Sequence, residues 1–131
     1  GAGEAMRRAL AAAALSPADI GYINFHGTGT RSNDEAEARA VGSVLGPEVP
    51  GSSTKGATGH TLGAAGALEA VICALALRHG LMPAGVNTRV VDSALPVRYL
   101  RENVRASLSR VMSNSFGFGG SNCSLILARA G

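Results

Sequence analysis

Apolar residues recur along this chain with two different spacings, one typical of helices and one typical of short buried strands. Long stretches rich in Ala and Leu favour helices, and short apolar runs bounded by turn residues favour strands. The expected helices are residues 1–15, 34–46 and 61–79, and the expected strands are residues 20–25, 51–54, 107–114 and 121–129. Between the third helix and the last two strands, residues 85–103 follow no regular pattern.

Helices alternate with strands along most of the chain and a hairpin ends it, which predicts an α/β fold. Strands that alternate with helices pair in parallel, so we expect a largely parallel sheet with helix-covered faces, finished by antiparallel strands. Asp34 can cap the second helix, whose first turn also carries Glu35 and Glu37, where the helix dipole favours acids. The third helix is apolar nearly all round, which predicts that it is buried.

Composition narrows the class of protein and its partners. The 131 residues are 46% hydrophobic, with 18 Gly and no Trp, which is typical of one soluble Gly-rich domain. A net charge of +3 falls well short of a nucleic-acid footprint. The longest apolar run, residues 61–77, is broken by two Gly and by Glu69. We therefore expect neither a nucleic acid nor a membrane as a partner.

The two cysteines and the start of the chain suggest where the protein works. Cys73 and Cys123 form no metal or redox motif, and we expect both to be buried free thiols. No signal peptide is visible, which together with the free thiols fits a cytoplasmic protein. The chain begins without Met inside an expected helix, which suggests a piece of a longer protein.

Three loops follow expected strands and carry unusual side chains. His26 opens the first loop, Lys55 and His60 lie in the second, and the third is the turn SFGFGG after Asn114. In parallel sheets the functional loops meet at the carboxyl ends of the strands. We therefore expect a site at this edge, with both imidazoles in a common pocket and the Lys55 ammonium close behind.

The two histidines suggest acid–base or oxyanion chemistry. Taken singly, His26 or His60 is as well explained as a structural histidine with satisfied hydrogen bonds. Together at one edge, they can act as neutral N–H donors to a developing oxyanion or as general bases. His60 precedes the third helix, whose positive dipole end would lower the pKa of the imidazole and keep it neutral.

Lys55 and Glu69 form the expected ion pair of this site. Lys55 is the only lysine in the chain, and Glu69 is the only acid on the third helix. A buried carboxylate needs a partner, and Lys55 is the obvious one. The pair could simply tie the loop to the helix, a role that is compatible with catalysis.

Small hydroxyls and two phenylalanines surround the histidines in sequence. Thr28 and Thr30 stand beside His26 and suit a ligand that carries amides. Phe116 and Phe118 lie between glycines, as a gate on a mobile backbone would, although ordinary core aromatics explain them equally well.

A nucleotide-cofactor oxidoreductase is the remote alternative. The glycines of TGHTLGAAG resemble the nucleotide-binding loop of short-chain dehydrogenases. That loop should follow the first strand, whereas here it follows the second. No lysine follows Lys55, so the Tyr-x-x-x-Lys pair of those enzymes is absent, and a Walker loop fails because Lys55 precedes the glycines.

Three motifs together carry a family resemblance. HGTGT with ND (His26 to Asp34), KGATGH (Lys55 to His60) with Glu69, and NSFGFGG (Asn114 to Gly120) are similar to the C-terminal half of β-ketoacyl-acyl carrier protein synthases, in the thiolase superfamily. The resemblance covers residues 1–131. It implies half of a thiolase-like α/β fold with α-β-α-β-α layers, in which this half contributes a helix-covered, mixed five-stranded sheet.

The resemblance also implies an activity and residue roles. Such enzymes catalyse a decarboxylative Claisen condensation of malonyl carrier protein with an acyl thioester on an active-site Cys. His26 and His60 match the catalytic histidines, Lys55 the active-site lysine and Glu69 its carboxylate partner. The residues that match the pantetheine-binding and gating positions are Thr28, Thr30, Phe116, Phe118 and Gly119.

The histidine pair indicates the elongating class, and the implied pathway is fatty acid or polyketide synthesis, including aryl polyenes. The implied partners are acyl carrier protein with its 4′-phosphopantetheine arm, the N-terminal half of the same enzyme and a second subunit in a homodimer. No bound cofactor or metal is implied. The nucleophilic Cys belongs to the absent half, so we expect this chain alone to be inactive in condensation. A chain-length-factor subunit that lacks the nucleophile is the alternative, although both histidines argue against it.

Overall fold

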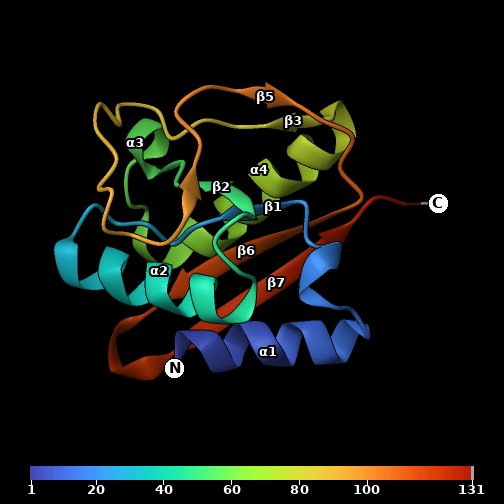
Figure 1. Cartoon of the computed structure of the whole chain (residues 1–131), viewed down its shortest axis with the longest axis horizontal. Helices are drawn as coiled ribbons and strands as arrows, with labels where there is room; N and C mark the ends of the chain where they lie inside the picture. The colour runs from blue at the N-terminus through green and yellow to red at the C-terminus, as the bar shows by residue number, and fades with distance from the viewer. Residues whose placement is uncertain (131) are drawn as a thin grey trace.

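A computed structural model describes residues 1–130, and the three expected helices and four expected strands follow one another in the expected order, with α3 and three short strands in addition (Figure 1). The helices are α1 (Ala2–Ala13), α2 (Arg31–Val44), α3 (Lys55–Thr58) and α4 (Ala65–His79), with 3-10 turns at Pro17–Asp19, Leu62–Ala64 and Phe118–Gly120. The strands are β1 (Tyr22–Asn24), β2 (Pro50–Ser52), β3 (Leu81–Met82), β4 (Arg98–Tyr99), β5 (Val104–Arg105), β6 (Arg110–Phe116) and β7 (Asn122–Ala128).

Five of the strands form one mixed sheet in the order β4-β2-β1-β6-β7. β1 pairs in parallel with β2 and with β6, β2 pairs in parallel with β4, and only β6 and β7 are antiparallel. β3 and β5 make a separate two-stranded antiparallel sheet. The expected mixed five-stranded sheet, closed by an antiparallel hairpin, is therefore confirmed.

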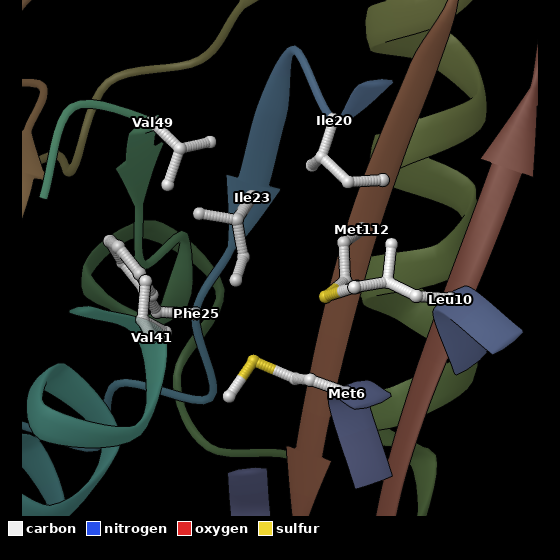
Figure 2. Close-up of a cluster of buried hydrophobic side chains, with 8 residues drawn as sticks. All are labelled: Met6, Leu10, Ile20, Ile23, Phe25, Val41, Val49 and Met112. Atoms are coloured by element: carbon white, nitrogen blue, oxygen red, sulfur yellow. The ribbon is translucent and has the colours of Figure 1, made fainter. Parts of the chain in front are cut away.

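Helices cover both faces of the large sheet, with α1 and α2 on one side and α4 on the other (Figure 1). Neighbouring residues of β1 point to opposite faces, so Ile23 joins the α1–α2 core and Tyr22 joins the α4 core. Figure 2 shows the first core, where Met6 of α1 and Met112 of β6 approach from one side and Val41 of α2 from the other. The two cores fix β1 and β6 at the centre of the molecule.

Helix α4 differs from its prediction at both its start and its surface. A 3-10 turn precedes it, so the helix begins at Ala65 instead of residue 61. One side packs on the sheet, but Val71 and Leu75 on the other side are 56% and 46% exposed, so the expectation of a fully buried helix is wrong. By length and composition alone, Leu62–His79 would suffice to cross a membrane, with mean hydropathy 1.4. A core helix of a folded domain passes the same test, and α4 packs on β6 in that way.

Other boundaries also depart from the sequence pattern. Helix α2 begins at Arg31 with Thr30 as its N-cap residue, so Asp34 lies in the first turn and is not the cap. The Gly-rich loop after β2 contains the one-turn helix α3. Residues 85–103 were expected to be irregular, yet they supply the edge strand β4. Cys73 is buried as expected, but Cys123 on β7 is exposed.

Candidate active site

The three loops that follow β1, β2 and β6 meet at one edge of the sheet. The rings of His26 and His60 are nearly perpendicular, at 87°, with centroids 5.5 Å apart. Phe116, at the end of β6, has its ring centroid 5.7 Å from that of His26. The expected convergence of the two imidazoles is therefore confirmed, but they do not share a pocket as expected, because His60 lines the adjoining cavity and His26 does not. Within residues 1–130, no group of three or more His, Cys, Asp or Glu is placed to hold a metal ion.

Glu37 of α2 fixes the backbone around His26. Its two carboxylate oxygens accept hydrogen bonds from the backbone N–H groups of His26 and Gly27, both at 2.8 Å. The side-chain amide of Asn114 donates to the same carboxylate at 3.2 Å. Burial raises the pKa of Glu37 to about 7, while these three donors favour its ionised form. The sequence pattern marks Glu37 only as one of several acids at a helix start and does not predict its contacts with this loop.

Lys55 lies between Glu69 and His26. Its ammonium forms an ion pair with Glu69 and donates to the backbone carbonyl of His26 at 2.5 Å. Both side chains of the pair are buried, which confirms the expected partnership. Burial raises the pKa of Glu69, and the hydrogen bond and charge of Lys55 oppose that rise. The pair thus links α4 to the loop that carries His26.

Burial and Lys55 together determine the protonation state of His26. The Lys55 ammonium lies 3.4 Å from Nδ1 of His26, and because an ammonium can only donate, Nδ1 is the acceptor. Burial, with smaller effects from the charges of Lys55 and His60, lowers the pKa of His26 to about 4. The ring is therefore neutral at physiological pH and carries its proton on Nε2.

His60 is oriented by a different contact from the one expected. Helix α4 begins at Ala65, so His60 does not cap it directly. Instead, the backbone N–H of Leu62 donates to Nδ1 of His60 at 3.1 Å. With Nδ1 engaged as an acceptor, a neutral His60 carries its proton on Nε2, as His26 does. Unlike His26, the side chain of His60 is exposed.

The residues expected to bind substrate lie in the segment that follows β1, at the end of β6 and in the turn after it, and of these residues only Thr28 lines the adjoining cavity described below. The hydroxyls of Thr28 and Thr30 hydrogen bond to each other at 2.7 Å. Phe118 is fully exposed, with a relative accessibility of 103%, so the reading of it as a core aromatic is wrong. Gly119 follows with φ 76°, a left-handed conformation that suits glycine. Phe116 is partly buried beside His26.

A cavity of about 460 Å³ adjoins the same loops. Thr28, Lys55 and His60 line it on one side. Residues between 86 and 97, including Asn87 and Thr88, form its other side. They belong to the segment for which the sequence predicts no regular element. The cavity therefore lies between the candidate catalytic loops and the segment leading to β4.

These observations do not support either cysteine as the nucleophile. Cys73 is buried on α4, and burial raises the pKa of its thiol to about 12, so the reactive thiolate is not available at neutral pH. Cys123 lies exposed on β7, opposite Ser115 of β6.

Comparisons with known proteins identify relatives of this chain. The mitochondrial 3-oxoacyl-[acyl-carrier-protein] synthase of Arabidopsis thaliana is 44% identical over 135 residues, covering 98% of this chain and 29% of the relative. A ketosynthase solved in complex with its chain length factor, from Xenorhabdus doucetiae, is 52% identical with a TM-score of 0.93, covering 99% of this chain and 33% of that one. The ishigamide ketosynthase/chain length factor is 37% identical with a TM-score of 0.96, covering 100% of this chain and 33% of that one.

These comparisons confirm the thiolase-like ketosynthase fold of the α/β sheet. The chain spans about a third of the length of the relatives that it matches. Residues 1–89 match the family described as beta-ketoacyl synthase, C-terminal domain. This chain, with its paired histidines at the carboxyl ends of parallel strands, therefore belongs to the β-ketoacyl synthase C-terminal domain family.

Proposed function

We propose that residues 1–131 form the C-terminal domain of a condensing enzyme that extends an acyl chain with malonyl carrier protein, in fatty acid or polyketide synthesis. The observation that carries the proposal is the shared state of the two histidines. His26 and His60 each accept a hydrogen bond at Nδ1, which leaves an Nε2–H donor on each of two adjacent rings. Two N–H donors beside each other suit an oxygen that gains negative charge during the reaction.

The reaction begins with decarboxylation. The bond between the α-carbon of the malonyl thioester and its carboxylate breaks, carbon dioxide leaves, and the electron pair moves into an enolate. The Nε2–H groups of His26 and His60 donate to the enolate oxygen and stabilise it. The enolate carbon then attacks the carbonyl of the enzyme-bound acyl thioester, a carbon–carbon bond forms, and the cysteine sulfur leaves as a thiolate.

Lys55 and Glu69 act on His26 in this scheme. Burial, together with the positive charge of Lys55 beside Nδ1, disfavours a second proton on the ring, so His26 stays a neutral donor. Glu69 balances the buried ammonium, which would otherwise be costly to hold in the interior. The pair therefore positions the imidazole and maintains its tautomer.

The substrate in this proposal arrives on the 4′-phosphopantetheine arm of an acyl carrier protein, and no resident cofactor takes part. Thr28 and Thr30 offer paired hydroxyls to the amides of the arm, and Phe118 with Gly119 forms the movable side of its entrance. The Arabidopsis thaliana relative is named for an acyl carrier protein, which supports this class of substrate.

The nucleophilic cysteine is supplied by an N-terminal half of the same cytoplasmic enzyme. The exposed apolar side of α4, with Val71 and Leu75, is the surface on which that half packs. The complete enzyme pairs with a second subunit to form a dimer, which we propose to be a homodimer. We expect the 131-residue chain alone to give no ketoacyl product.

The test is a condensation assay of this chain together with its N-terminal half, with malonyl and acyl carrier proteins as substrates. Loss of one oxyanion donor costs about 100- to 1000-fold in kcat, so His26→Ala and His60→Ala should each lower decarboxylation and condensation by that order. His79→Ala is the matched control, because His79 is an exposed histidine at the end of α4. Equal activity of all three variants would refute the proposal.

A chain-length-factor-like subunit is the second candidate. Two of the solved relatives are ketosynthases described with a chain length factor, which is the reason to consider this class. Such a subunit would bind a catalytic partner yet support no turnover at its own site. In the assay above, the parent would then give no product until a catalytic partner is added, and His26→Ala would leave that product formation unchanged, whereas the proposed condensing role requires its loss.

A further inference from the structure

Ser53 lies where the two loops of the candidate site cross. It follows β2, is 8% exposed, and its hydroxyl donates to the backbone carbonyl of Gly27 at 2.6 Å. The same hydroxyl oxygen lies 3.4 Å from the backbone N–H of Lys55, which donates to it. One side chain therefore touches both the loop that carries His26 and the helix that begins with Lys55.

The backbone of Ser53 is fixed from the opposite side. Its N–H donates to the hydroxyl of Tyr99 at 3.3 Å. The Tyr99 ring stacks on Phe25, with centroids 6.1 Å apart and planes within 10°. Because Phe25 directly precedes His26 in the chain, this stack ties Ser53 and the start of the His26 loop to a common support.

The loop also presses closely on Ser53. A Cβ atom at Gly27 would lie 2.5 Å from the Cβ of Ser53, so no larger residue fits there without a shift. Gly27 has φ +37°, a conformation that side chains other than glycine rarely adopt. The contact is thus tight, and a change in the side chain of Ser53 is transmitted to the loop.

Two contacts connect the loop that carries His26 with α3. The Ser53 hydroxyl joins Gly27 to the start of α3, and the Lys55 ammonium joins α3 to the carbonyl of His26. We infer that Ser53 is a positioning residue that sets the spacing between the His26 ring and the Lys55 ammonium. The inference rests on the proposed function, in which that spacing keeps His26 a neutral donor.

The neighbouring residue Ser52 provides a matched control. It is fully buried, and its hydroxyl makes two hydrogen bonds, to the Tyr22 hydroxyl at 2.7 Å and to the Pro83 carbonyl at 2.5 Å. Neither partner belongs to the candidate site. Ser52→Ala and Ser53→Ala thus each delete one buried hydroxyl from adjacent positions, but only the second deletion reaches the His26 loop.

The experiment compares the two variants in the enzyme assembled with its N-terminal half. Steady-state kinetics gives kcat and KM, urea unfolding gives stability, and NMR with labelled histidine follows the protonation of His26 with pH. The groups that face His26 are Lys55 and His60, with Glu69 behind the ammonium and Glu37 on the loop backbone. These neighbours are unchanged in both variants.

For Ser53→Ala we expect a fall in kcat of about 2- to 10-fold, the worth of one net hydrogen bond, with KM for the carrier-bound substrate unchanged. His26 should remain neutral down to pH 5 in the parent and titrate at a higher pH in this variant, because a displaced loop changes both the burial of the ring and its distance from the Lys55 ammonium. Ser52→Ala should lower the urea midpoint but leave kcat and the His26 titration as in the parent.

The inference is overturned if Ser53→Ala leaves kcat and the His26 titration unchanged, or if both variants lower kcat in proportion to their lost stability. If Ser53→Ala does not fold, Ser53→Cys, which keeps a similar shape with a much weaker donor, carries the same test. A parent enzyme that gives no condensation product refutes the proposed function instead, while the titration difference still decides the role of Ser53.

Discussion

The two histidines of the site are held in different ways. His26 is buried, its backbone N–H is bound by Glu37 and its ring faces the Lys55 ammonium. His60 is exposed and is oriented by the backbone N–H of Leu62. One donor is therefore fixed by the interior of the fold, whereas the other depends on a surface turn.

Replacing Glu37 should loosen the His26 loop. A glutamine keeps one acceptor oxygen but turns its amide toward an N–H donor, so one backbone N–H loses its partner. We expect Glu37→Gln to lower the free energy of unfolding by about 1–3 kcal/mol and to reduce activity. Urea unfolding measures the first effect. Glu35→Gln on the same helix, which removes only surface ion pairs with Arg31 and Arg39, should change stability far less.

The low pKa of His26 predicts how stability depends on pH. The pKa is about 4 in the folded chain and 6.5 is its usual value, so the neutral ring stabilises the fold above pH 6.5. This contribution, at most about 3 kcal/mol, is lost as pH falls through about 4. In urea unfolding between pH 7.5 and 4, His26→Gln should therefore lose less stability than the parent. An equal or larger loss in the variant would contradict the assigned protonation state.

At the scale of secondary structure, the one-turn helix α3 depends on contacts with residues 85–88. A helix this short is not stable by itself. The Asn87 side-chain amide donates to the Gly56 carbonyl at 2.8 Å, and Asn87 adopts a left-handed backbone with φ 68° to do so. Gly56 packs directly against the backbone of Val86. These contacts hold the helix that begins with Lys55.

A methyl group at Gly56 should therefore displace α3. The Cβ of an alanine there would lie 2.0 Å from the carbonyl oxygen of Val86, so the two segments must separate. We expect Gly56→Ala to lower stability by about 1–3 kcal/mol, measured by thermal unfolding, and to lower condensing activity. Gly63→Ala is the control, because no atom lies within 4 Å of its Cβ position. Similar stability losses in the two variants would refute this view of α3.

Sequence patterns predict the long helices and strands but not the two-residue strands. α4 and the β6–β7 hairpin have patterns long enough to predict, whereas β3, β4 and β5 contain two residues each and have no periodicity to detect. At the site, His26, Lys55, His60 and Glu69 stood out as rare residue types in Gly-rich or apolar surroundings. Glu37 and Ser53 did not, because their importance comes from hydrogen bonds that only the folded chain creates.

At the scale of the whole molecule, the exposed side of α4 is the surface that matters most for assembly with the proposed N-terminal half. Apolar side chains that are adjacent on the exposed side of a helix often mark a surface that another protein segment covers. Val71 and Leu75 lie one helical turn apart on this side, while Glu69 and Cys73 face the sheet. The helix that supplies the partner of Lys55 thus also presents the surface proposed for the N-terminal half.

Charges on this surface should prevent assembly without unfolding the chain. Burying a Val or Leu side chain contributes about 1.5–3 kcal/mol, so Val71→Asp with Leu75→Asp should weaken binding of the N-terminal half at least 100-fold. Isothermal titration calorimetry measures the affinity, and circular dichroism checks the fold. Val90→Asp is the control, because Val90 is also apolar and exposed but lies on the segment before β4. Unchanged affinity in the double variant would place the contact elsewhere.

The pairing of β1 with β6 also has a consequence for synthesis of the chain. β1 is translated well before β6, its neighbour in the sheet. Until β6 has been synthesised, one edge of β1 has no hydrogen-bonding neighbour, and Ile23 does not pack against Met112. Nascent chains stalled before β6 should therefore be protease-sensitive and bind chaperones, and become resistant only once the final hairpin has left the exit tunnel.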